Sequence, residues 1–121
     1  MYNKLLIVGH KDTPYRDFCK YVRESPFYDA IDSLLSGGTN TFWPLVEKYG
    51  QSNDILVIKY TPKGGGSKEA YIKNCKKRII TLIEEAEHYF ILPYSMYPPS
   101  LSLSYTLDEL VKREKKYIGR I

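Results

Sequence analysis

The feature that most constrains the fold is the alternation of short apolar runs with segments of helical periodicity. Residues 4–8 form a nearly continuous apolar run that stops at Gly9, which is typical of a parallel strand buried on both faces. Similar runs occupy 31–35, 54–58, 89–92 and 117–121, and apolar residues recur at helical spacing over 15–24, 39–49, 72–86 and 107–114. Strand and helix alternating in this way predict an α/β domain with a parallel sheet.

The expected architecture has three layers, with a doubly wound sheet of about five parallel strands and four helices. Right-handed crossovers place the helices on both faces of such a sheet. We expect the strand order 3-2-1-4-5, because it creates a switch point between the first and fourth strands, where sheets of this kind bind ligands. All 121 residues, 1–121, fit a single domain, and an apolar fraction of 43% can bury its core.

Composition limits the environment and the partners that we expect. No run approaches a membrane span, and the opening run is too short for a signal peptide, so we expect a cytoplasmic protein with no membrane partner. Cys19 and Cys75 lack metal-site spacing, and we expect neither a metal nor another cofactor. The net charge of +4 is a mild excess that suits a phosphate ligand as readily as nucleic acid. Twelve tyrosines with many lysines suggest a thermophile or one of its viruses, and a homodimer is an open alternative to a monomer.

Several glycine-containing turns should meet at one edge of the sheet. There the backbone can approach a phosphate, and the helix that follows each turn supplies unpaired N–H groups and a partial positive charge. The segment from Ser36 to Thr39 is the most informative, because it joins a strand directly to a helix, although a plain tight turn would have the same residues. The predicted ligand-binding residues on these turns are Gly9, His10, Lys11, Ser36, Gly37, Gly38 and Thr39.

Two further segments allow more than one interpretation. Thr106 and Glu109 have the Thr-x-x-Glu spacing of a capping box at the start of the 107–114 helix, and this alone would explain both residues. A ligand-binding role for Thr106 is the alternative. The loop 94–99 combines aromatic residues with prolines, and either stacks on a base or packs on itself.

The stretch from Arg78 to Pro93, followed by Thr106 and Glu109, resembles the SLOG superfamily, a Rossmann-like group. That group includes the LOG phosphoribohydrolases, the lysine-decarboxylase-like proteins and the DNA processing protein A. The resemblance implies that Arg78 pairs with phosphate and that Glu109 contacts ribose or acts as acid and base, so these two are the candidate catalytic residues. It requires the helix that carries Arg78 to begin near Lys73. Ile79 replaces the lysine of the family pattern, and the glycines of its Pro-Gly-Gly segment are absent.

The function expected from the sequence is binding of a nucleotide, or of a nucleotide-derived ligand of the ribose-phosphate type, at the carboxyl edge of the sheet. One alternative is a phosphoribohydrolase, an N-glycosidase that acts on nucleoside monophosphates. Another is a non-catalytic nucleic-acid-binding protein, whose binding would weaken steeply with salt.

Overall fold

The protein is described by a computed structural model that covers residues 2–38, 42–64, 66–113 and 117–120. In chain order the elements are β1 (Leu5–Val8), α1 (Tyr15–Arg23), a short 3-10 turn (Tyr28–Ala30), β2 (Ser33–Ser36), α2 (Trp43–Ser52), β3 (Leu56–Lys59), α3 (Lys68–Glu85), β4 (His88–Ile91), α4 (Leu101–Arg113) and β5 (Tyr117–Arg120). The predicted α/β class, with a parallel sheet and four helices, is confirmed.

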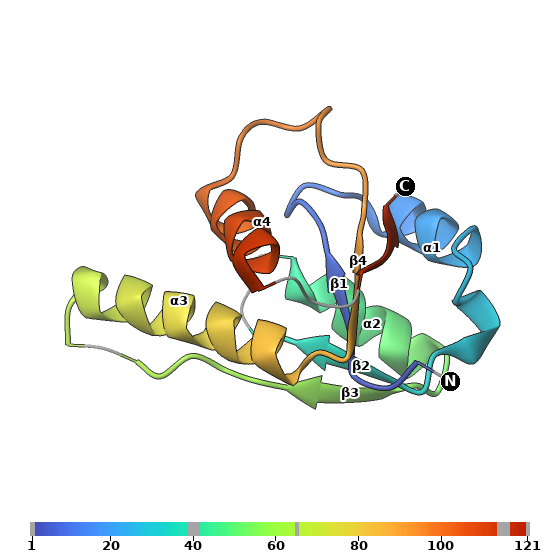
Figure 1. The fold of residues 1–121 in the computed structure, drawn as a ribbon, viewed down its shortest axis with the longest axis horizontal. Helices are drawn as coiled ribbons and strands as arrows, with labels where there is room; N and C mark the ends of the chain where they lie inside the picture. Colours follow the sequence, from blue (N-terminus) through green and yellow to red (C-terminus); the bar gives the residue numbers. More distant parts are fainter. Residues whose placement is uncertain (1, 39–41, 65, 114–116, 121) are drawn as a thin grey trace.

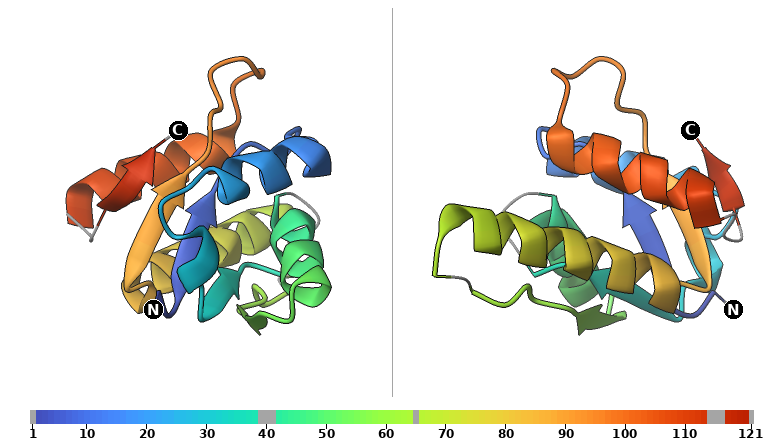
Figure 2. Two further views of the ribbon diagram at one scale, coloured as in Figure 1. Left: turned by 90° about the vertical axis from the view of Figure 1, so that its right-hand side faces the viewer. Right: turned by 60° about the vertical axis from the view of Figure 1, so that its left-hand side comes forward.

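The strands lie in the order β3-β2-β1-β4-β5, and all neighbouring pairs are parallel. β1 and β4 are in continuous register from Leu5 opposite His88 to Val8 opposite Ile91. Helices α1 and α2 cover one face of the sheet, and α3 and α4 cover the other (Figures 1 and 2). The chain therefore leaves β1 towards one face and leaves β4, its neighbour, towards the opposite face.

The core explains why the first strand is apolar throughout. All four residues of β1 are buried, since helices cover both sides of the strand. Phe18 and Val22 of α1, Val46 of α2, and Leu82 and Ile83 of α3 pack in the same apolar cluster. This rigid centre fixes the carboxyl ends of β1 and β4, from which the candidate site is built.

Helix α2 begins at Trp43, four residues after its expected start, and three further helix boundaries differ from the expected ones. Helix α2 continues through Gly50, which is buried; a Cβ there would meet Val57 and lie 3.1 Å from the Ile55 carbonyl, so Gly50 permits close packing and does not end the helix. Helix α3 begins at Lys68, where the Ser67 side chain accepts from the Ala70 amide at 3.2 Å. Helix α4 begins at Leu101, six residues before the predicted start.

Because α3 begins early, Arg78 lies in the middle of the helix and not near its start. The first turns of the helix reach beyond the sheet (Figure 1), so a residue well inside the helix can still lie level with the sheet's carboxyl edge. Helix α3 does not begin near Lys73, which is the start that the resemblance required. Arg78 meets the β2–α2 turn from the middle of α3.

Candidate functional site

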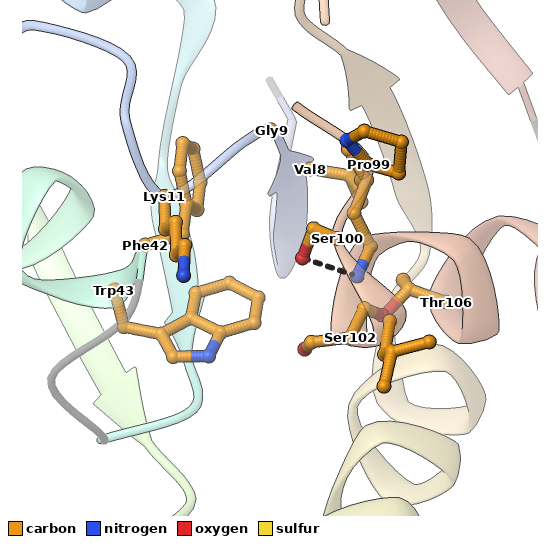
Figure 3. Close-up of a pocket in the computed structure, with 11 residues that line it drawn as sticks. Val8, Gly9, Lys11, Phe42, Trp43, Pro99, Ser100, Ser102 and Thr106 are labelled. Atoms are coloured by element: carbon orange, nitrogen blue, oxygen red, sulfur yellow. Dashed lines mark hydrogen bonds between the residues drawn. The ribbon is translucent and has the colours of Figure 1, made fainter. Parts of the chain in front are cut away.

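A cavity of about 380 Å³ lies where the chain leaves β1 and β4 for opposite faces of the sheet. Lys11, Phe42 and Trp43 form one side of it, and Pro99, Ser100, Ser102 and Thr106 form the other (Figure 3). The space lies within the usual size range of small-molecule sites. It brings together the β1–α1 turn, the start of α2 and the start of α4.

Gly9 lies at the floor of this cavity for a steric reason. A Cβ on Gly9 would lie 2.6 Å from the Phe42 ring and 3.2 Å from Leu92. Glycine therefore lets the aromatic ring pack directly on the end of β1. Lys11 follows with an exposed side chain and is the charged residue of the cavity lining.

The start of α4 provides the opposite wall. Ser100 is the residue before the helix, and its hydroxyl accepts from the Leu103 amide at 3.4 Å, as a capping serine does. Thr106 lies one turn further on, where its hydroxyl donates to the Ser102 carbonyl at 2.8 Å. The predicted capping box of Thr106 and Glu109 is therefore wrong, because both residues lie inside the helix. Thr106 does line the cavity.

The predicted anion-binding turn after β2 makes its hydrogen bonds within the protein. The Ser36 hydroxyl donates to Glu47 at 2.8 Å and accepts from the Gly38 amide at 3.2 Å. Gly38 has φ +69°, and a Cβ there would lie 2.6 Å from the Thr61 hydroxyl, which explains why this residue is glycine. The residues from Ser36 to Gly38 do not line the cavity, and Thr39 lies outside the described residues.

Arg78 does not line the cavity, but it contacts Trp43, which does. Its Nη1 donates to the Gly37 carbonyl at 2.6 Å, and its guanidinium lies 5.9 Å from the centre of a Trp43 ring. Burial lowers the pKa of Arg78, because the charged form loses solvation. Arg78 thus fixes the Trp43 indole against the β2–α2 turn.

His10 fastens the long loop between β4 and α4. Its Nδ1 accepts from the Asp12 amide at 3.0 Å, so the neutral ring carries its proton on Nε2, which donates to the Pro98 carbonyl at 2.6 Å. The ring also stacks on Tyr97, with centroids 5.0 Å apart. His10 is buried, and its contacts hold Pro99 and Ser100 in place beside the cavity.

Glu109 lies deeper in α4 than the cavity lining. The residue is 8% exposed, and its carboxylate is 3.6 Å from the Lys112 ammonium. The structure therefore brings Gly9, Lys11 and Thr106 together at the cavity, with His10 behind them. It leaves Arg78 and Glu109 outside the lining.

The sequence interpretation missed Phe42, Trp43 and the first turn of α4. One signal could have found the helix start: Ser100 follows two prolines and precedes an apolar helical pattern, as capping serines often do. Nothing comparable marked Trp43, because its contact with Arg78 joins residues that are 35 apart in the chain.

Comparison with models of known protein families, with curated proteins and with solved structures found no match to this chain. Within the described ranges, no cluster of three or more histidine, cysteine, aspartate or glutamate side chains could hold a metal ion. No helix in the same ranges is both long enough and apolar enough to cross a membrane.

Proposed function

We propose that the cavity beside Lys11 binds a nucleotide or a nucleotide-derived ligand of the ribose-phosphate type. The observation that carries the proposal is the position of the cavity, between a lysine and the first turn of α4 at the carboxyl ends of β1 and β4. Parallel α/β sheets bind ligands in the crevice where neighbouring strands send their chains to opposite faces.

The two walls suit the two ends of such a ligand. The first turn of a 13-residue helix presents backbone N–H groups and a partial positive charge, and Lys11 adds a full one, so phosphate is favoured there. The Trp43 indole offers an aromatic surface for a base or a sugar. The Ser102 hydroxyl supplies a donor and an acceptor for ribose, and the Thr106 hydroxyl, which donates to the Ser102 carbonyl, supplies an acceptor.

We infer that the domain is a divergent Rossmann-like fold of the SLOG type. The β3-β2-β1-β4-β5 order and the close packing at Gly9 support this inference. We propose binding and not hydrolysis, since Glu109 pairs with Lys112 outside the cavity lining and Arg78 is engaged by Gly37.

Trp43 provides a direct assay, because it is the only tryptophan in the chain. We expect AMP to change its fluorescence saturably and adenosine to bind more weakly, since it lacks the phosphate. Lys11→Gln should weaken AMP binding about 10- to 100-fold, the value of a hydrogen bond to a charged group. Lys20→Gln, which removes the same charge from an exposed position on α1, should leave the affinity unchanged.

Two outcomes would count against the proposal. One is a lack of response to millimolar AMP, both in Trp43 fluorescence and in thermal stability, which a ligand of the native state must raise. The other is equal AMP affinity for Lys11→Gln and wild type. Release of free adenine during the titration would instead support the N-glycosidase alternative.

A further inference from the structure

A second hollow lies between α3 and α4, on the outer side of the α4 start. This groove has a volume of about 560 Å³ and is lined mainly by apolar and aromatic side chains, among them Tyr71, Ile72 and Tyr105. Tyr71 is 43% exposed and Ile72 is 44% exposed. Figure 2 shows the two helices side by side, with the first turns of α3 reaching past α4.

The charge of the chain is concentrated on the helix that forms this groove. Residues 68–78, the first eleven of α3, contain five basic residues and one acidic residue. Their net charge of +4 equals that of the whole chain, so the other 110 residues are neutral in sum. The four lysines of this stretch, Lys68, Lys73, Lys76 and Lys77, are all exposed.

These lysines make no ion pair with any residue that the structure describes. Lys73 has Lys76 and Lys77 three and four residues further on, so all three lie on neighbouring positions of one helix face. Like charges at this spacing destabilise an isolated helix. No ion pair therefore offsets the repulsion within the cluster, whereas an anionic partner would neutralise it.

Aromatic side chains lie beside the positive charge. The Lys76 ammonium is 5.3 Å from the Tyr105 ring centroid. Tyr105 lines the groove from α4, and Lys76 and Tyr71 line it from α3. Proteins that bind single-stranded nucleic acid without sequence preference combine a positive groove, which follows the phosphates, with aromatic rings on which bases stack. An acidic peptide or an anionic membrane would also be attracted by the lysines, and the pairing of lysines with exposed rings favours single-stranded nucleic acid over either.

We propose that the α3–α4 groove binds single-stranded nucleic acid, with bases against Tyr71 and Tyr105 and phosphates along the lysines of α3. This site is separate from the proposed nucleotide cavity, although Leu101 and Ser102 line both. The buried Arg78 guanidinium adds positive charge at the inner end. The single acidic residue of the lining, Asp108, leaves the groove positive in sum.

The test is fluorescence anisotropy with labelled single-stranded DNA and RNA of about 15 nucleotides, within the range of such binding sites. The triple variant Lys73→Gln, Lys76→Gln, Lys77→Gln should bind at least about tenfold more weakly near 0.1 M salt. Its slope of log affinity against log salt should be smaller by about 2, at about 0.7 per phosphate contact on a single strand. Tyr71→Ala should lower affinity with an unchanged slope, because it removes stacking and no charge.

The matched control is Arg16→Gln, Lys20→Gln, Arg23→Gln, which removes three exposed charges from α1 on the opposite face of the sheet. Circular dichroism checks that each variant is folded, and Tyr71→Ala tests the groove independently if the lysine variant unfolds. Equal losses for the two charge variants would overturn the proposal, because net charge alone would then explain binding. So would binding to phosphatidylserine vesicles or polyglutamate with no binding to either oligonucleotide. If Lys11→Gln did not change AMP affinity, the proposed nucleotide site would fail, but the proposal for the groove would stand, since Lys11 does not line the groove.

Discussion

Gly37→Ala should be the most informative single substitution in the protein. A Cβ at this position would lie 2.7 Å from Cε2 of the Trp43 indole and would also meet Nε1 of that ring and Nη1 of Arg78. Trp43 and Arg78 are each 7% exposed, so neither can simply turn into solvent. The methyl group must therefore displace the indole, the guanidinium, or both.

The expected loss of unfolding free energy follows from these two contacts. Overpacking a well-packed core with a methylene-sized group destabilises by about 1–3 kcal/mol. Displacing Arg78 from the Gly37 carbonyl, a bond of 2.6 Å, adds the loss of a charged hydrogen bond, about 1.5–3 kcal/mol. We expect a total of about 2.5–6 kcal/mol, measured by urea denaturation followed by circular dichroism, with an unchanged m value.

Gly64→Ala is the matched control, because a Cβ there meets no atom within 4 Å. It should change stability by no more than about 1 kcal/mol, in the stabilising direction if the unfolded chain loses entropy. Trp43→Phe removes the ring that the new methyl group meets, so Gly37→Ala should be milder by about 1 kcal/mol or more in that background. A Gly37→Ala loss below about 0.5 kcal/mol, or full additivity with Trp43→Phe, would refute the packing described here.

Three further substitutions test separate parts of the structure. Ser100→Ala should lower stability by about 0.5–2 kcal/mol in urea denaturation, because the α4 start loses its cap, and no loss would place the helix start elsewhere. His10→Ala removes the bond to Pro98 and the stack on Tyr97, so limited proteolysis should cleave the 93–100 loop faster than in wild type, and an equal rate would contradict this tether. Burial raises the pKa of Tyr49 to about 12, while an unfolded tyrosine ionises near about 10. The unfolded state therefore releases its proton first, and stability should fall from about pH 10 to about pH 12, less steeply in Tyr49→Phe.

The sequence revealed the strands and helices because their patterns are local. The run from Leu5 to Val8 is apolar since helices cover both faces of β1, and the periodic residues of α1 and α3 reach the same core. Such patterns need no knowledge of distant residues. The short strands and the first three helices were accordingly predicted to within about four residues of their ends, whereas α4 begins six residues before its expected start.

Boundaries and site residues depended on contacts that a local pattern does not encode. The helix expected over 39–49 was to stop before Gly50, yet α2 continues through this residue, whose close packing involves Val57 of β3. Thr106 and Glu109 fit a capping box by spacing, while the chain starts α4 at Leu101 after Ser100. Gly37 was predicted as a ligand-binding residue from its place in the turn after β2, whereas its close contacts with Arg78 and Trp43 come from distant parts of the chain.

The central position of β1 has a consequence for how the protein is made. This strand leaves the ribosome before its partner β4, which ends only at Ile91, and the continuous Leu5-to-Val8 register with β4 needs that later segment. Until then β1 offers an apolar strand with a free edge, which is the kind of surface that aggregates or recruits chaperones.

The cavity forms later in synthesis than the β1–β4 pairing, because the residues of its second wall begin at Pro99. Pairings between segments this far apart in sequence form slowly, since the loop between them must close first. A nascent chain stalled before residue 99 would contain the glycine turn and Trp43 but no cavity. Ligand added during synthesis should therefore stabilise the completed domain and leave the earlier steps of folding unchanged.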